Sequence, residues 1–412
     1  MLSGGTPSKS ERAYWGGPIP WLTPKDMGQW TGSTENTVTL KAIGNGTRLA
    51  PEDAIFIAVR GMSLHKEIRI IRSSTALAFN QDIKAIVPKD GVNGRFLYYA
   101  LIAKKNELLG SVEAAGHGTG RLPTDKLCSL SIPQTSQLNQ QAIANLLSQL
   151  DDKIELNRQM NETLEATARL FFKDWFVDFG PTRAKAEGQP PYLAAELWEL
   201  FPDALDADDK PMGWREGTLA DIARLNPDVW GSKNTPLSIE YVDLANTKWG
   251  EIEQTQVFAW DKAPSRARRI LNPGDTIIGT VRPGNGSFAL VGKSGLTGST
   301  GFAVLRPQRP ECREAIYISA TSPETIETLS HLADGAAYPA VRPEVVASQP
   351  IIVPGHNCLE AFSRLTAPLI DAMLANRQES RTLSQTRDLF LPKLMSGEIR
   401  LRDAERLVEQ VA

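Results

Sequence analysis

Two long stretches of the chain, residues 143–175 and 362–394, each contain a series of mostly apolar residues. Within each series, successive members are alternately four and three positions apart. Most of these positions are apolar, with a polar section in the middle of each stretch. This spacing is typical of the heptad seam of a coiled coil. About 35 residues of helix would be ~50 Å long, and a narrow seam of that length needs a partner. The sequence therefore predicts two long helices that pair with each other; an amphipathic helix packed on a globular body is the alternative.

The seam carries asparagine at matched places in the two stretches. Asn157 and Asn376 are predicted to set the register of pairing, and the alternative is that both face solvent. The residues that we expect to pair the helices are Ile143, Leu147, Leu150, Ile154, Asn157, Leu164, Phe171, Leu369, Met373, Asn376, Leu383 and Phe390.

The segments before each long helix alternate short β-branched or aromatic runs with Gly, Pro, Asn and Asp. This pattern predicts strands joined by turns. The clearest runs are IFIAV (55–59), IRIIR (68–72), TIIGTV (276–281) and GFAVLRP (301–307).

The chain contains an internal repeat at an offset of about 220 residues. Asn157-Arg158-Gln159 recurs as Asn376-Arg377-Gln378, and 8 of the 15 positions 157–171 are identical at this offset. Val59-Arg60 and Val281-Arg282 match upstream at nearly the same offset. Ordered agreement in separate segments indicates a duplicated architecture.

We therefore predict an α+β protein with two β-rich domains, two long antiparallel helices that form a coiled coil, and an internal pseudo-twofold repeat. The expected segments are a first domain at 1–138, a long helix at 139–179, a linker at 180–212, a second domain at 213–355, a second long helix at 356–396 and a tail at 397–412.

The repeat leaves the first copy shorter at its start. At an offset of 222, Met1 corresponds to Ala223, so the segment that opens the second copy at 214–222 has no match. Either the start codon is misassigned, or the chain begins late and the tail covers an exposed strand edge. The tail itself starts with a strand-like GEIRL (397–401), and one or two charged helical turns are expected after it.

Charge is divided unevenly although the net charge is only -3. Residues 1–138 carry 16 Lys/Arg against 11 Asp/Glu, whereas residues 139–210 carry 7 against 14. A nucleic-acid surface must then be local, or a partner must supply positive charge. The three widely spaced cysteines exclude a disulfide scaffold, and no secretory signal or membrane span is visible, so we expect a cytoplasmic protein.

Catalytic signatures are missing from the sequence. GSFALVGKS (286–294) lacks the glycine that a phosphate loop needs at position 287, and no DPPY-like methyltransferase tetrapeptide occurs. The four histidines have no metal-ligand spacing, so no metal site is predicted. Asp203, Asp208 and Lys210 have the residue types of a metal-dependent nuclease, but their spacing is too short for that site and the segment is acidic, so a solvated loop is strongly favoured.

Several segments resemble a known family. LLSQLDDKIELNRQMNETLEATARLFFKDWFVDFGPTRAK (146–185) resembles the central region of the specificity (S) subunits of type I restriction-modification enzymes. MLSGGTPSKSERAYWGGPIPWLTPKDM (1–27), GSTGFAVLRP (298–307) and LFLPKLMSGEIRL (389–401) resemble other parts of the same subunits. The match touches nearly the whole chain.

The resemblance implies a non-catalytic subunit that reads a split sequence in double-stranded DNA, one target-recognition domain for each half-site. It implies that helix length sets the spacer between the half-sites. The implied partners are two methyltransferase (M) subunits, which bind S-adenosylmethionine and methylate adenine, and, where an R subunit is present, two restriction (R) subunits that use ATP and Mg²⁺. No cofactor is expected on this chain and no membrane is involved.

The DNA-contacting residues are predicted from glycine-rich turns and from arginines at matched places after strands. Structural turns, hairpins or surface ion pairs are the alternative for each. The candidates are Thr6, Ser8, Lys9, Tyr14, Arg60, Lys66, Arg69, Arg72, His117, Arg121, Arg266, Arg268, Arg269, Arg282 and Tyr338.

Three functions stay open at this point. A DNA-recognition subunit is favoured by the duplicated domains and the missing catalytic motifs. A metal-dependent nuclease would use Asp203, Asp208 and Lys210. A pairing scaffold that has lost DNA reading would bind partner subunits yet show only salt-sensitive, non-specific DNA binding.

Overall fold

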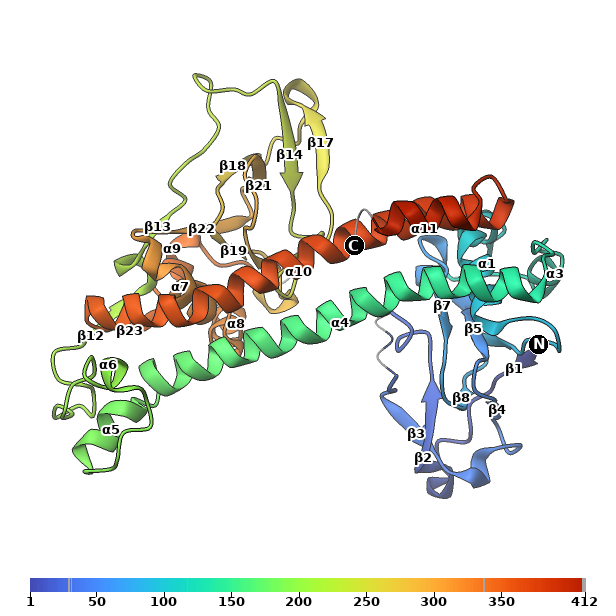
Figure 1. Ribbon diagram of the computed structural model, residues 1–412, viewed down its shortest axis with the longest axis horizontal. Helices are drawn as coiled ribbons and strands as arrows, with labels where there is room; N and C mark the ends of the chain where they lie inside the picture. Colours follow the sequence, from blue (N-terminus) through green and yellow to red (C-terminus); the bar gives the residue numbers. More distant parts are fainter. Residues whose placement is uncertain (29, 31, 117, 336–337, 410–412) are drawn as a thin grey trace. The chain divides into compact units, whose positions relative to one another are not determined.

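The computed structural model describes residues 1–412 apart from 29, 31, 117, 336–337 and 410–412. The chain forms two compact units (Figure 1). Unit 1 comprises Met1–Leu156 and Glu379–Ala412, and unit 2 comprises Asn157–Gln378. Each unit contains one β-rich domain and a section of both long helices.

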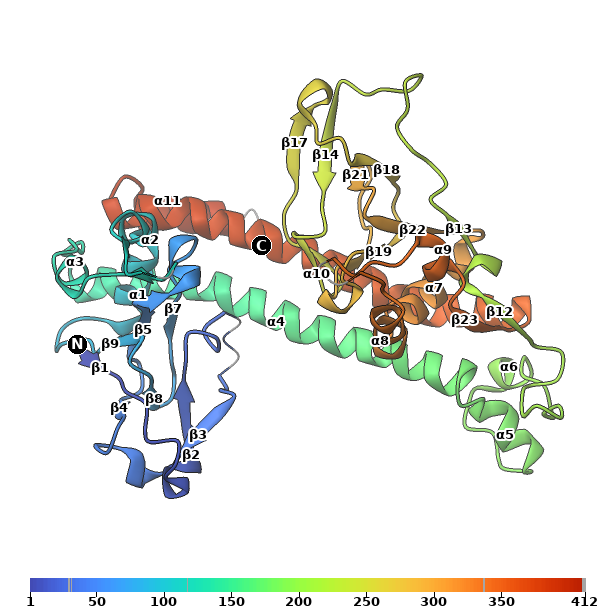
Figure 2. The same cartoon turned by 180° about the vertical axis from the view of Figure 1, so that it is seen from behind.

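Unit 1 contains two four-stranded sheets and one three-stranded sheet. Their strand orders are β1-β9-β5-β7, β3-β2-β8-β4 and β10-β11-β6. Figure 2 shows the first of these sheets next to the long helix α4, with the second farther from it. The strands are β1 (Leu2–Ser3), β2 (Trp15–Leu22), β3 (Asn36–Val38), β4 (Arg48–Ala50), β5 (Ile55–Ala58), β6 (Arg60–Gly61), β7 (Ile70–Arg72), β8 (Leu77–Phe79), β9 (Ile83–Ile86), β10 (Glu113–Ala114) and β11 (Gly120–Arg121).

Unit 2 repeats the two four-stranded sheets and adds two pairs of strands. Its orders are β13-β22-β19-β20, β17-β14-β21-β18, β12-β23 and β15-β16. The strands are β12 (Arg215–Thr218), β13 (Ala223–Leu225), β14 (Ser238–Val242), β15 (Thr247–Lys248), β16 (Glu251–Ile252), β17 (Gln256–Ala259), β18 (Ala267–Leu271), β19 (Thr276–Gly279), β20 (Phe288–Leu290), β21 (Leu296–Ser299), β22 (Phe302–Pro307) and β23 (Pro350–Val353).

The repeat extends to strand direction. In each unit one parallel pair stands among antiparallel neighbours: β2 runs parallel to β8 with Trp21 opposite Ala78, and β14 runs parallel to β21 with Tyr241 opposite Thr297. The four apolar runs of the sequence all lie on strands, namely β5, β7, β19 and β22. The predicted α+β duplication is confirmed.

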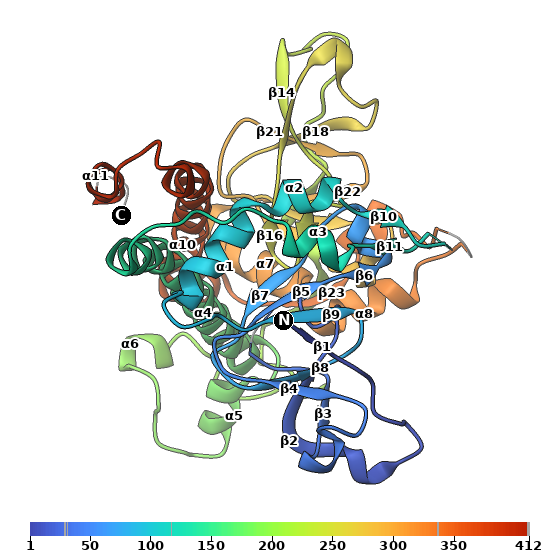
Figure 3. The same ribbon diagram turned by 90° about the vertical axis from the view of Figure 1, so that its right-hand side faces the viewer.

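Short helices cover the sheets in both units. Asn93 and Ser322 cap α1 and α8 by accepting hydrogen bonds from the first-turn amides, as expected for these residue types. Figure 3 shows α1 beside α4. These helices are α1 (Gly94–Ala103), α2 (Lys105–Gly110), α3 (Thr124–Cys128), α7 (Arg313–Ala320), α8 (Pro323–His331) and α9 (Pro343–Ala347).

The two long helices are α4 (Gln137–Phe176) and α10 (His356–Ser396). They run antiparallel within unit 2, because Asn157 contacts Asn376 while Phe176 contacts Phe362. They are antiparallel within unit 1 as well, where Lys153 pairs with Glu379 and Asp151 with Arg387. The seam side chains predicted to pair the helices are all buried or partly buried.

Asn157 is one of the most buried polar residues, with 1% of its surface exposed. Its Nδ2 lies 3.4 Å from the Asn376 carbonyl, and Asn376 Nδ2 donates to Asn161 Oδ1 at 2.9 Å. The polar middle of the seam thus consists of amides that face each other across the pair rather than solvent.

Residues 180–212 leave the helix pair and return to it. They contain α5 (Gly180–Ala186) and α6 (Ala195–Trp198). Phe201 from this excursion is buried in contact with Trp175 and Trp214. The segment is therefore held to the rest of unit 2 by aromatic contacts of Phe201.

The tail differs from the prediction at its start, whereas the expected helical turns are present. Residues 397–400 form a turn, and α11 (Leu401–Glu409) follows, so the expected strand in GEIRL is wrong. Ala404 is fully buried in a cluster with residues of α1, α4 and α10, and Figure 3 shows α11 beside α10. The burial of Ala404 against other helices outweighs the strand-like pattern of the five residues 397–401. The tail therefore covers helices, and not the exposed strand edge of the first domain that the sequence suggested.

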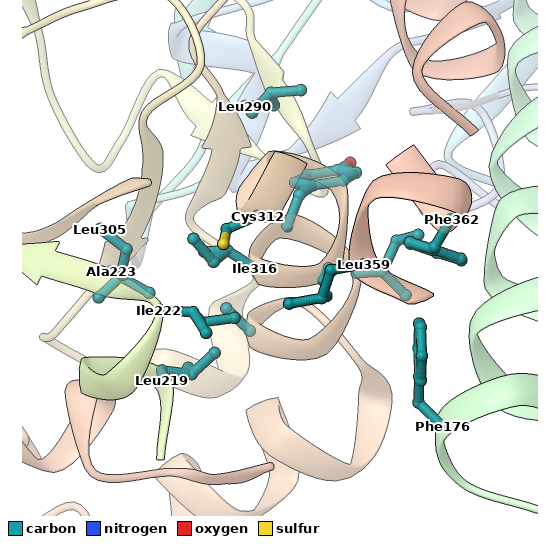
Figure 4. Packing of buried hydrophobic residues seen from close by; sticks show 14 of the residues in the cluster. Phe176, Leu219, Ile222, Ala223, Leu290, Leu305, Cys312, Ile316, Leu359 and Phe362 are labelled. Atoms are coloured by element: carbon teal, nitrogen blue, oxygen red, sulfur yellow. The ribbon is translucent and has the colours of Figure 1, made fainter. Parts of the chain in front are cut away.

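The largest apolar cluster of unit 2 spans the domain and both long helices, and two smaller clusters lie within the domain. Figure 4 shows Ile222, Leu305 and Ile316 from the domain together with Phe176 and Phe362 from the long helices. No helix in the described part of the chain is both long and apolar enough to span a membrane.

Candidate nucleic-acid interface

In unit 1 two of the predicted arginines meet on a small sheet. Arg60 on β6 is directly opposite Arg121 on β11, and both are exposed. Opposed residues of antiparallel strands have Cβ atoms about 5 Å apart, so the two arginines lie next to each other on this sheet. The part of the sheet that carries Arg60 and Arg121 is called the edge. Burial raises the pKa of the neighbouring Asp82, and Arg60 opposes that shift. The edge presents a paired positive charge of the kind that binds phosphate or guanine.

Unit 2 has the same edge in a reduced form. Val281 bridges to Ala340, and Asp334 bridges to Ala340, in the places of β6, β11 and β10. The Arg282 guanidinium lies over the Tyr338 ring, 5.3 Å from its centroid, and the Tyr338 side chain is 75% exposed. The two residues predicted separately from matched turns thus form one cation–π pair.

The N-terminal loop is held by two tryptophans. Trp15 Nε1 donates to the Ser8 carbonyl at 3.1 Å and Trp21 Nε1 to the Gly5 carbonyl at 3.1 Å. Thr6 donates to Gln81 at 2.6 Å, whereas Lys9 is exposed. Ser8 shares a hydrogen bond with Ser10, and Tyr14 packs partly buried against a small apolar cluster. The loop is therefore a fixed turn that can present Lys9 and Ser8.

The basic residues after β6 separate into two kinds. Lys66 is exposed beside η3 (Met62–His65). Arg69 donates to the Pro24 carbonyl at 2.7 Å, and Arg72 pairs with Asp53. The structure gives both arginines partners inside the domain, so it does not bring them together with Arg60 and Lys66.

The three arginines around β18 have different surroundings. Arg268 lies 4.7 Å over the ring of Trp260, which contacts Trp230 edge-on. Arg266 is exposed and donates to the Tyr241 hydroxyl at 3.0 Å. Arg269 is partly buried, and burial lowers its pKa. Arg268 with the two tryptophans forms a mixed aromatic and basic surface, whereas Arg269 is turned into the domain.

The remaining candidate, His117, lies outside the described residues. Trp230 and Trp260 are not among the residues predicted from the sequence, although the concentration of four of the nine tryptophans of the chain in residues 213–355 was a usable signal. It also passed over Met62, which is 75% exposed next to Arg60.

The carboxylates of the nuclease alternative do not converge. Asp203 is 90% exposed and pairs with Lys185, while Lys210 pairs with Asp208 and Glu216. Among the residues whose placement is described, no group of three or more His, Cys, Asp or Glu side chains could hold a metal ion. The segment is a surface loop tied down by ion pairs.

Comparison with known proteins gives one consistent result. Residues 2–166 match the family model of the type I restriction modification DNA specificity domain. The type I restriction enzyme MjaIX specificity subunit of Methanocaldococcus jannaschii is 27% identical over an alignment 419 residues long, gaps included, that covers 98% of this chain and 92% of the relative. The EcoR124I/EcoR124II specificity subunit of Escherichia coli is 32% identical over 151 residues, covering 36% of this chain and 37% of the relative.

One solved structure agrees at the level of the fold. The S subunit of a type I restriction-modification system from M. genitalium aligns with a TM-score of 0.54 and 15% identity, covering 96% of this chain and 92% of that chain.

Proposed function

Because the chain belongs to the family of type I restriction-modification specificity subunits, we propose that it reads a bipartite DNA target, with one half-site for each β-rich domain. It is a recognition subunit, and the catalytic steps belong to other subunits. The observation that carries the proposal is the duplicated edge with Arg60 and Arg121 in unit 1 and Arg282 and Tyr338 in unit 2. Two equivalent reading edges are what a target in two parts requires.

Each edge is suited to base contacts. An arginine can donate two hydrogen bonds to guanine in the major groove. Such a pair favours the binding free energy of guanine over that of another base by about 1–3 kcal/mol. Lys9, Lys66 and Arg266 are exposed and can hold phosphates, which fix the register without reading sequence. Arg268 over Trp260 can do the same in the second domain.

The partners follow from the same proposal. Two M subunits bind the chain, carry S-adenosylmethionine and methylate adenine, and two R subunits with ATP and Mg²⁺ add cleavage where the host encodes them. This chain holds no cofactor of its own. Because the net charge of this chain is -3, the M subunits supply much of the positive charge that contacts the DNA phosphates. The complex acts in the cytoplasm, where the host DNA lies.

Single-molecule methylome sequencing tests the proposal in cells that express the chain with its M partner, with cells lacking this chain as the control. A two-part adenine-methylated motif should be present only when the chain is expressed. DNA binding without sequence preference, steeply dependent on salt, would instead indicate the pairing scaffold. Magnesium-dependent cleavage by the chain alone, lost in Asp208→Ala, would indicate the nuclease.

A further inference from the structure

A tryptophan stands at the tip of a hairpin where its backbone conformation is unfavourable. β15 and β16 pair with Lys248 opposite Glu251, so the turn consists of Trp249 and Gly250. Both have positive φ, 45° and 93°, as in a type I′ turn. Asn or Asp normally precedes glycine there, because a bulky residue pays about 1 kcal/mol or more for the left-handed conformation.

The hairpin tip is held in place by its backbone. Trp249 N–H donates to the Gly286 carbonyl at 2.6 Å, and Gly250 N–H donates to the Phe288 carbonyl at 2.8 Å. A Cβ on Gly250 would come within 3.1 Å of the Tyr317 hydroxyl and 3.0 Å of Arg377 Nη2, so the glycine fits closely over these side chains. None of these contacts needs an indole at position 249.

The indole has one covered face. A Cβ built on Gly286 would lie 2.5 Å from both Cδ2 and Cε2 of Trp249, the two atoms of the bond shared by its rings. Gly286 therefore lies against the face of the indole. Phe288 meets the ring edge-on at 5.8 Å. Even so, 62% of the Trp249 surface is exposed, so the ring is backed on one side and open on the other.

The reading edge of the second domain lies at the same turn. Gly286 ends the turn that begins at Arg282, whose N–H donates to the Pro339 carbonyl at 2.7 Å. Arg282 is also a non-glycine residue with positive φ, 47°. Strained backbone concentrates at functional sites. Nearby charge is mixed: Lys248 and Arg282 are accompanied by the carboxylates of Glu251 and Asp334.

Unit 1 exposes an apolar side chain at the matched corner. At the repeat offset of 222 residues, Arg60 corresponds to Arg282, and Met62 corresponds to Gly284. Met62 is 75% exposed at the start of η3. Methionine and aromatic side chains are used as wedges against base steps and as stacking platforms for bases. Both domains thus place an arginine next to an exposed apolar group.

We propose that Trp249 is a stacking residue of the second domain, which packs its open face against a base or deoxyribose of the second half-site beside Arg282. The inference rests on the proposed function, because it needs the chain to bind DNA. DNA is favoured over a partner protein because Gly286, which lies against the indole, ends the turn that begins at Arg282 of the reading edge.

The test uses the full chain assembled with its M subunits and a duplex that carries the methylated motif. Trp249→Asn places a residue favoured by the type I′ turn at the tip and removes the stacking surface. We expect Trp249→Asn to bind DNA at least about tenfold more weakly while its melting temperature is unchanged or higher. Trp249→Phe should bind within about threefold of the parent chain.

The salt dependence separates stacking from charge. Trp249→Asn should leave the slope of log affinity against log salt unchanged, whereas Arg266→Ala, which removes an exposed cation assigned to phosphate in the same domain, should reduce it by about one. Met212→Asn is the matched control, because Met212 is 58% exposed in the excursion away from the hairpin, and it should bind DNA like the parent chain.

Unchanged DNA affinity in Trp249→Asn would overturn the inference. So would a lower melting temperature, which would make Trp249 a structural residue, or loss of M-subunit assembly with DNA affinity intact, which would make it a protein contact. If the parent complex itself has no sequence preference, the proposed function fails, and that result is visible before any variant is made.

Discussion

The two units build the same fold but join it to the long helices in different ways. In unit 2 one apolar cluster extends from the domain through Trp175 and Phe176 of α4 to Phe362 of α10. In unit 1 the domain core is a separate cluster, and a second cluster links α1 to α4, α10 and α11. A duplicated fold can therefore keep its topology while it changes the way its domain is attached.

The polar contacts show the same difference at matched tyrosines. In unit 1 Tyr99 donates to Asp151 at 2.6 Å, and Arg387 donates to the other oxygen of Asp151 at 2.6 Å. In unit 2 the counterpart Tyr317 is fully buried, and Arg169 lies 6.0 Å from its ring centroid while donating to the Ile318 carbonyl at 3.0 Å. The tyrosine is kept, but its charged neighbours come from different helix positions.

The largest expected effect comes from the apolar anchor of unit 2. Trp175→Ala should lower the free energy of unfolding of unit 2 by about 4 kcal/mol, because it leaves a large cavity in a continuous core. Leu394→Ala, at the matched place in unit 1, should cost about 3 kcal/mol. Urea denaturation followed by hydrogen exchange assigns each loss to a unit. A loss confined to unit 1 in Trp175→Ala would contradict the comparison.

The polar anchor of unit 1 should have the next largest effect. Asp151→Asn removes the carboxylate between Tyr99 and Arg387 and should cost about 2 kcal/mol, since charged hydrogen bonds are lost in a partly buried place. Urea denaturation of unit 1 measures it, and exposed Asp152→Asn is the control. Equal stability of both variants would show that the apolar contacts alone attach the domain.

A variant in one reading edge should lose sequence specificity for one half-site only. Arg60→Ala should relax the first half of the methylated motif and Arg282→Ala the second, each by about 1–2 kcal/mol of discrimination. Methylome sequencing with each variant shows which half becomes degenerate. Loss of specificity in both halves from either variant would mean that the domains do not read independently.

The smallest effect concerns alkaline pH. Burial, reinforced by the Asp151 carboxylate, raises the pKa of Tyr99 well above its ordinary value. Above pH ~10 an unfolded tyrosine ionises while Tyr99 in the folded state stays protonated, so its stabilising contribution is present below pH ~10 and is lost as pH rises. Tyr99→Phe should cost about 1 kcal/mol at pH 8 and lose less stability than the parent between pH 9 and 11. A parallel decline of parent and variant would contradict this.

The long helices, the duplication and the matched arginines at residues 60 and 282 could be predicted, because periodicity and repetition are local properties of the sequence. The contacts that attach each domain to the long helices could not be predicted from the sequence. Asp151 and Arg387 are 236 residues apart, and nothing in the sequence pairs them. Trp249 was missed because tryptophan is not a turn residue, so its place at a hairpin tip becomes visible only with the backbone angles.

The division of the chain between the units has a consequence for the order of folding during synthesis. Unit 2 is continuous in the sequence, whereas unit 1 needs residues 379–412 in addition to its first 156. As the chain leaves the ribosome, the core of the first domain can form from residues 2–132, but its attachment cluster waits for Phe390 to Ala404. The part of the protein made first is therefore the last to be finished, and a chain shortened at its end would damage the first domain before the second.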